Sequence, residues 1–153
     1  PELALFAADQ GLPIRFIELM PMGPLAAQWE SRFVSADQIR ERLEPIVRQW
    51  RLLPQGADSA RSYAVTLNDG REVTIGFITP MSCNFCEACD RIRITATGDV
   101  FPCLMDHPRG NLLSAIHPRF DPELVDEILQ TSLSQKAENH PIAGFAVITT
   151  IGG

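Results

Sequence analysis

Cysteine is confined to one short segment of this chain, and that segment restricts how the chain can fold. The protein has 153 residues and four cysteines, Cys83, Cys86, Cys89 and Cys103. The first three recur at gaps of two residues, and the fourth comes after a pattern of strand, turn and strand. Thiolates at this spacing can surround a metal centre. A metal site here requires the chain to fold back between Cys89 and Cys103.

Charge and hydropathy narrow the class of protein. The net charge of −6 argues against a general nucleic-acid binder, which would carry a basic face. The sequence has no apolar run of the roughly eighteen residues that span a membrane, and no basic and then apolar leader, so we expect no membrane partner and a cytoplasmic location. In the cytosol a cysteine cluster binds metal more often than it forms disulfides. The chain begins Pro1-Glu2 without methionine, so we expect it to be a piece of a longer protein.

The first residues read as one α/β unit. Apolar positions over residues 3–10 predict the end of a helix, which Gly11 stops and Pro13 keeps from resuming. Residues 14–20 are rich in β-branched and aromatic side chains and predict a strand. Residues 22–33 carry few periodic signals and are expected to form a loop. A helix, a turn and a strand in this order resemble the end of an α/β layer.

The rest of the chain predicts helices around two hairpins. Ser35 and Gln38 form a capping-box pattern at the start of a helix expected over residues 36–49, although Pro45 lies inside it, where proline ends or kinks a helix. The other expected elements are a hairpin of residues 63–67 and 72–78, a hairpin of residues 91–95 and 100–103, and a helix of residues 122–137. We therefore expect an α+β fold, in which a remnant α/β unit precedes a small antiparallel sheet of hairpins with flanking helices.

Two kinds of metal site remain open from the spacing alone. A structural zinc site usually shows two separated Cys-x-x-Cys pairs, whereas here three cysteines precede one, although all four thiolates could still reach one zinc ion. An iron–sulfur cluster held by three of the cysteines would leave one iron open to a ligand nitrogen or oxygen.

Arginines next to the cysteines add fixed positive charge. Arg91 and Arg93 are alternate residues of a predicted strand, so they are expected to face the same way. Guanidinium groups bind phosphate oxygens in a bidentate manner. The pair therefore favours an anionic ligand, with an exposed strand face paired to carboxylates as the alternative.

The segment around the cysteines resembles a known family. The run FCEACDRIRITATG at residues 85–98, followed by Cys103-Leu104, is similar to the C-terminal part of the GTP 3′,8-cyclase family, also called molybdenum cofactor biosynthesis protein A. These are radical S-adenosylmethionine enzymes. Three more segments agree with the family, namely RFIELMP at residues 15–21, Lys136 with His140, and the terminal Gly152-Gly153.

The resemblance implies an architecture with two 4Fe-4S clusters, one at each end of an incomplete TIM-type barrel. The first cluster, held by a Cys-x-x-x-Cys-x-x-Cys motif, binds and cleaves S-adenosylmethionine, and that motif is absent from these residues. Residues 1–33 would then be a remnant of the radical barrel. Residues 34–153 would form the C-terminal domain for the auxiliary cluster and GTP.

The resemblance also implies roles for individual residues. The three ligands of the second cluster, whose open iron binds the guanine of GTP, match Cys86, Cys89 and Cys103. The residues that match GTP contacts are Arg91, Ile92, Arg93, Gly152 and Gly153, the last two in a tail that reaches the active site. Met20 matches a methionine that lines the S-adenosylmethionine pocket.

Some positions depart from the family pattern or receive no role from it. Cys83 has no counterpart among the three ligands, and Asp90 stands where the family usually has asparagine. An acidic side chain there disfavours a nearby triphosphate unless it pairs with a neighbouring arginine. Lys136 and His140 match the family without an implied chemical role, and cationic side chains near the end of a helix would account for them.

The activity that the resemblance implies belongs to a longer protein. That enzyme would convert GTP to (8S)-3′,8-cyclo-7,8-dihydroguanosine 5′-triphosphate in molybdenum cofactor biosynthesis, while the present residues alone would be inactive. Separated from the N-terminal radical barrel, they would expose apolar surface and form a homodimer or another self-associated state. The alternatives are a non-catalytic zinc-binding structural or interaction module and the auxiliary-cluster domain of another radical enzyme.

Overall fold

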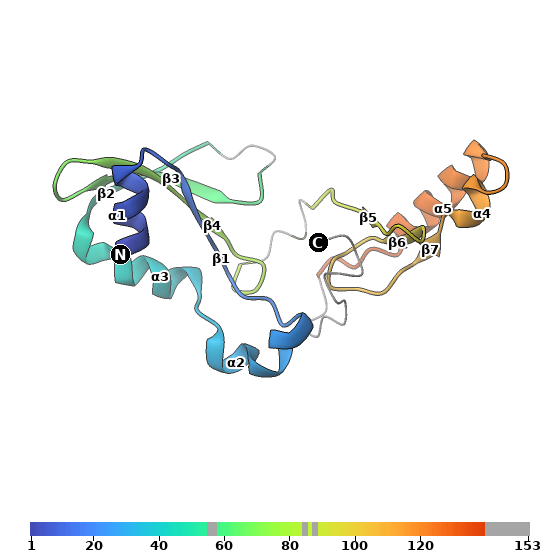
Figure 1. The fold of residues 1–153 in the computed structure, drawn as a ribbon, viewed down its shortest axis with the longest axis horizontal. Helices are drawn as coiled ribbons and strands as arrows, with labels where there is room; N and C mark the ends of the chain where they lie inside the picture. Colours follow the sequence, from blue (N-terminus) through green and yellow to red (C-terminus); the bar gives the residue numbers. More distant parts are fainter. Residues whose placement is uncertain (55–57, 84–85, 87–88, 140–153) are drawn as a thin grey trace. The chain divides into compact units, whose positions relative to one another are not determined.

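The computed structural model describes residues 1–54, 58–83, 86 and 89–139 of the chain. Two compact units make up the protein. The first unit contains Pro1–Leu19 and Glu30–Phe85, and the second contains Met20–Trp29 and Cys86–Gly153. Figure 1 shows the helices and strands of both units.

A mixed sheet of four strands organises the first unit, in the order β1-β4-β3-β2. The strands are β1 (Ile14–Ile17), β2 (Val47–Leu52), β3 (Arg61–Leu67) and β4 (Glu72–Ile78). Strands β3 and β4 form an antiparallel hairpin, and β1 joins β4 in parallel. Gly70 takes a φ of 89° in the hairpin turn, a conformation that glycine adopts without strain.

Helices cover this sheet and bury one apolar core. The covering elements are α1 (Glu2–Asp9), α3 (Ala36–Leu43) and the 3-10 helix η2 (Glu44–Ile46), while the short α2 (Trp29–Arg32) has no buried residue. The buried residues of the core are Ala4, Ala7, Leu43, Val47, Val65, Leu67, Val73, Ile75 and Phe77. They come from α1, the end of α3 and strands β2 to β4, so burial of their side chains joins helices and sheet into one body.

The second unit is built on a three-stranded antiparallel sheet in the order β5-β6-β7. Its elements are the 3-10 helix η1 (Gly23–Gln28), β5 (Arg93–Ile94), β6 (Asp99–Phe101), β7 (Gly110–Asn111), α4 (Leu113–Ile116) and α5 (Pro122–Ser134). The side chain of Asp121 caps α5 by accepting hydrogen bonds from the backbone N–H groups of Glu123 and Leu124. In the described part of the chain, no helix has the length and apolar character that crossing a membrane requires.

Several expectations from the sequence are confirmed. The fold is α+β, both predicted hairpins form, and Ser35 and Gln38 make the reciprocal hydrogen bonds of a capping box. Asp121 caps the last helix as expected, and that helix ends at Ser134, a few residues earlier than predicted. These features depend on contacts between residues near in sequence, which is why local patterns predicted them.

Other expectations are wrong. The helix expected over residues 36–49 ends at Leu43, and Val47–Leu52 instead forms β2. The hairpins do not share one antiparallel sheet: one lies in a mixed sheet and the other in a separate antiparallel sheet. Residues 22–33, expected as a loop, contain η1 and α2, and the strand expected over residues 14–20 stops at Ile17. Pro45 lies at the start of η2 and cannot donate the N–H that an α-helix needs there. The helix therefore ends before it, and the residues after η2 pair with β3.

Candidate functional site

Three of the four cysteines belong to the second unit. Cys86, Cys89 and Cys103 are partly buried there, whereas Cys83 belongs to the first unit and is exposed. The N–H of Cys89 donates to the carbonyl of Cys86 over 3.1 Å, so the backbones of these two residues lie in contact. The structure thus separates Cys83 from the other cysteines by both unit and exposure.

Cys103 lies in a tight turn that comes directly after β6. The N–H of Met105 donates to the Cys103 sulfur over 3.4 Å, and the N–H of Asp106 donates to its carbonyl over 3.2 Å. Three hydrogen bonds from the Arg109 guanidinium to the Asp106 carboxylate, at 2.8, 2.9 and 3.1 Å, tie Arg109 to the same turn. The turn therefore presents the Cys103 sulfur on a braced backbone.

The electrostatics of Cys103 reflect nearby thiols. Burial raises the pKa of the Cys103 thiol, and the hydrogen bond from Met105 opposes that rise. Electrostatic repulsion from Cys86, Cys89 and Asp106 raises the pKa further. Binding to a metal would replace the proton of such a thiol.

The donor chemistry of this neighbourhood suits a thiolate-bound centre. Iron–sulfur clusters are held by cysteine thiolates. Three cysteines from two segments of one unit supply donors of this kind, and sulfur donors also suit zinc. Among the described residues, no three or more His, Cys, Asp or Glu side chains form a group that could hold a single metal ion.

The arginines extend from the cysteine segment into the β5–β6 hairpin. Arg93 begins β5 and pairs with Phe101 of β6 in the antiparallel register. In that register, residues before Arg93 and residues after Phe101 leave the hairpin at the same end, so Arg91 and Cys103 emerge together. The strand is shorter than the expected 91–95, and Arg91 lies just outside it.

Lys136 lies against the cysteine segment, although the sequence indicated no chemical role for it. Its ammonium donates to the Cys89 carbonyl over 2.6 Å and to the Arg91 carbonyl over 3.0 Å. It also lies 3.5 Å from the Cys89 sulfur in a third hydrogen bond. The family resemblance singled out this position, but only the tertiary contact reveals what the side chain does.

Glu18 is a second residue that sequence reasoning missed. It lies in the RFIELMP run and is only 2% exposed. Its carboxylate accepts hydrogen bonds from the N–H of Ala36 at 3.0 Å, the N–H of Met81 at 3.1 Å and the N–H of Ser82 at 2.9 Å. The Ser82 hydroxyl donates to it as well. Glu18 therefore joins β1, the start of α3 and the segment after β4 inside the first unit.

The remaining predicted site residues lie in varied surroundings. Met20 belongs to the second unit and is partly buried, as is Ile92, while Asp90 is exposed. His140, Gly152 and Gly153 lie outside the described residues. The roles of these six residues stay predictions.

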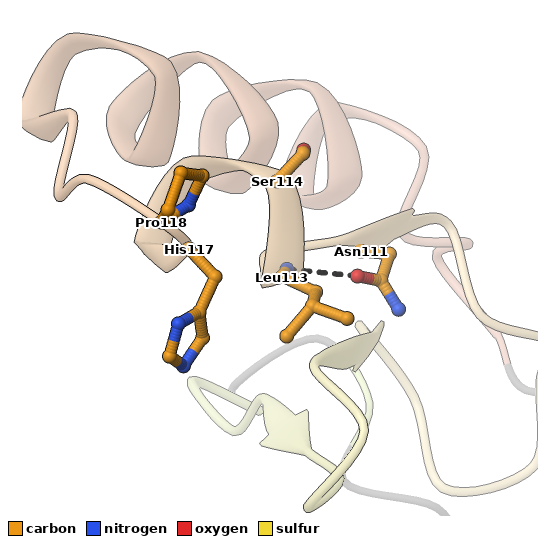
Figure 2. A pocket seen from close by; sticks show the side chains of 5 residues that line it. All are labelled: Asn111, Leu113, Ser114, His117 and Pro118. Carbon is orange, nitrogen blue, oxygen red and sulfur yellow. Dashed lines mark hydrogen bonds between the residues drawn. The ribbon is translucent and has the colours of Figure 1, made fainter.

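A hollow in the second unit has a different lining. It is bounded by Asn111, Leu113, Ser114, His117 and Pro118, shown in Figure 2. The Asn111 side chain accepts a hydrogen bond from the N–H of Leu113 at 2.8 Å and donates to Asp99 and to the Thr97 carbonyl. Asn111 therefore braces the β5–β6 turn, and we assign the hollow no role in binding.

Comparison with known proteins gives a consistent result. A sequence model of the family described as Molybdenum Cofactor Synthesis C matches residues 12–142. The GTP 3′,8-cyclase of Alkaliphilus metalliredigens is 33% identical over 139 residues, covering 91% of this chain and 41% of that protein. The GTP 3′,8-cyclase of Agrobacterium fabrum is 34% identical over 143 residues, covering 92% of this chain and 39% of that protein. The chain thus spans about two fifths of the length of these relatives.

Proposed function

This chain belongs to the Molybdenum Cofactor Synthesis C family, and we propose that it is the part of a GTP 3′,8-cyclase that holds a second iron–sulfur cluster and GTP. The observation that carries the proposal is the match of the family model to residues 12–142, within which Cys86, Cys89 and Cys103 belong to the same unit as the arginine hairpin. Relatives named GTP 3′,8-cyclase, each more than 30% identical, support the same assignment.

In this proposal the three cysteines hold a 4Fe-4S cluster. A cluster held by three cysteines would have one open iron, and that iron would supply a Lewis-acid position for the guanine of GTP. The turn after β6 presents the sulfur of Cys103, and Cys86 and Cys89, joined by a backbone hydrogen bond, supply the other two. Cys83, which has no counterpart among the three ligands of the family, is not a ligand in this proposal.

The arginines bind the triphosphate. Arg91 and Arg93 supply planar groups that hold phosphate oxygens by paired hydrogen bonds, and Ile92 lies between them in the contact segment. Holding the base and the phosphates at once fixes the position of the ribose. Such positioning can lower the activation barrier of a reaction by about 7 kcal/mol or more. The glycine tail, Gly152 and Gly153, adds backbone contacts to GTP, and Met20 lines the S-adenosylmethionine site of the whole enzyme.

The main partner of this chain is an N-terminal radical barrel. Strand β1 lies at the edge of its sheet and pairs in parallel with β4, as a strand of a larger α/β layer would. Ile17 on β1 and Leu3 and Phe6 on α1 are each more than half exposed, so they are available for contact with another part of the protein. We propose that residues 1–33 continue that barrel and that, without it, the exposed side chains drive self-association.

The cluster is tested by replacing single cysteines in the full-length protein. After anaerobic reconstitution, Cys86→Ser and Cys103→Ser should each lose about four irons per chain, the content of one cluster. Cys83→Ser is the matched control and should keep its iron. A wild-type protein that binds one zinc and no second cluster would support the structural-module alternative instead.

The nucleotide is tested by titration of the reconstituted protein. Arg91→Lys should weaken GTP binding about tenfold, or about 1.4 kcal/mol, because lysine cannot make the paired hydrogen bonds. Arg119→Lys, an exposed arginine of the same unit, is the control and should bind as the wild type does. Equal affinity for ATP and GTP would point to another radical enzyme with an auxiliary cluster.

A further inference from the structure

Lys136 makes its contacts with one short stretch of backbone. It is the only lysine in the sequence, and it lies just after α5. Its ammonium reaches the carbonyls of Cys89 and Arg91 and the sulfur of Cys89. One side chain thus contacts both a proposed cluster ligand and a proposed phosphate ligand.

The chemistry of the ammonium matches this arrangement. A lysine side chain has three N–H donors and no acceptor, and three acceptors surround it here. Hydrogen bonds from a charged donor are stronger than those between neutral groups. Bonds to two carbonyls on either side of Asp90 hold the peptide units between them in one conformation. The spacing of the cysteine sulfur from the arginine side chain is thereby restrained.

The anchor of Lys136 is itself well held. Its backbone N–H donates to the Leu133 carbonyl over 3.0 Å, which extends the end of α5. Helix α5 is capped by Asp121 and approaches β7 so closely that a Cβ on Gly110 would lie 2.8 Å from atoms of Ser132 and Ile128. The lysine therefore reaches the cysteine segment from a packed helix of the same unit.

From this geometry we propose that Lys136 is a positioning residue for the second cluster and for GTP, an inference that rests on the proposed function. It holds the backbones of Cys89 and Arg91 at a fixed distance from each other. Its N–H donation to the Cys89 sulfur would also favour the reduced form of a cluster bound there, because hydrogen bonds to the sulfurs affect a cluster's reduction potential.

The test uses the full-length, reconstituted enzyme. Lys136→Met removes the three donors at similar length, and Lys136→Arg keeps the charge. Arg119→Met, which removes an exposed cation from the same unit, is the matched control. The measurements are hydrogen exchange of residues 89–93, the reduction potential of the second cluster followed by electron paramagnetic resonance, and the KM for GTP.

In Lys136→Met we expect exchange of residues 89–93 to be about tenfold faster, the potential to shift to more negative values, and the KM to rise. In Lys136→Arg the shift in reduction potential should be smaller than in Lys136→Met. In Arg119→Met the exchange, the potential and the KM should all stay at their wild-type values. If Lys136→Met holds no cluster, the reduction potential is measured instead in Lys136→Gln, which keeps N–H donors without the charge.

The outcomes separate the two proposals. An enzyme that keeps all its iron after the substitution Cys89→Ser contradicts the proposed function. A wild type that holds the second cluster, with potential and exchange unchanged in Lys136→Met, contradicts only the role of Lys136.

Discussion

At the scale of single residues, Glu18 shows how hydrogen bonds keep a carboxylate charged inside a protein. Burial raises the pKa of Glu18, but hydrogen bonds from Ser82, Ala36 and Met81 outweigh this and lower the pKa below its usual 4.5. The donors come from segments far apart in sequence, so the carboxylate fixes the path of the chain from β4 towards Cys83 within the first unit.

Glu18→Gln should destabilise the protein. An amide NH2 group placed among N–H donors leaves them without an acceptor, which costs about 1–3 kcal/mol. Urea unfolding of the full-length protein measures the loss of free energy of unfolding. Glu41→Gln, an exposed position in α3, is the control and should change this free energy by less than about 0.5 kcal/mol.

The contribution of Glu18 should also depend on pH. Because the pKa is lowered in the folded state, the stabilisation is present above about 4.5 and is lost as the pH falls through the lower folded value. The difference in unfolding free energy between wild type and Glu18→Gln should therefore shrink in acid. A difference that stays constant from neutral pH down to acid unfolding would contradict this account.

At the scale of elements, the contact between β7 and α5 is set by the absence of a side chain at Gly110. A Cβ there would lie 2.8 Å from Ser132 Oγ and from Ile128 Cγ2, closer than real contacts allow. Ser132 is fully buried, and its hydroxyl finds no hydrogen-bond partner among the described residues. The two positions together define how near the helix can come to the sheet.

Gly110→Ala should destabilise the protein by about 1–3 kcal/mol, because α5 must move away from β7. Ser132→Ala should be nearly neutral or stabilising, since it removes a buried hydroxyl that has no partner in the described structure. The double variant should recover part of the loss. Thermal unfolding of the four proteins checks the prediction, and strictly additive effects would contradict the contact.

The elements also show where local sequence signals end. The capping box at Ser35 and Gln38 forms as predicted because both partners lie within one turn of helix. Strand β2 was missed because Val47–Leu52 continues a helical apolar pattern, and only the hydrogen bonds of β3 decide that it is extended. Pro45 indicated that the helix would end, but a proline does not specify which element follows the helix.

At the scale of the whole molecule, the chemistry is expected to need more chain than these residues. The four cysteines lie between residues 83 and 103, and the motif that generates a radical in the family is not among them. Residues 1–153 alone should therefore form no cyclic product from GTP. Chromatography of the products checks this, with the full-length protein as the positive control. Formation of the cyclic product by residues 1–153 alone would contradict the proposal that the reaction needs the N-terminal radical barrel.

By itself, the sequence was enough to indicate the family, the thiolate character of the site, the arginines beside it and both hairpins, because each depends on neighbouring residues or a compact motif. The tertiary structure decided that Cys83 lies in a different unit from Cys86, Cys89 and Cys103. It also decided that Glu18 and Lys136 brace segments more than forty residues away. Contacts between distant segments form only when the chain folds, since each depends on the packing of whole helices and sheets rather than on any local pattern.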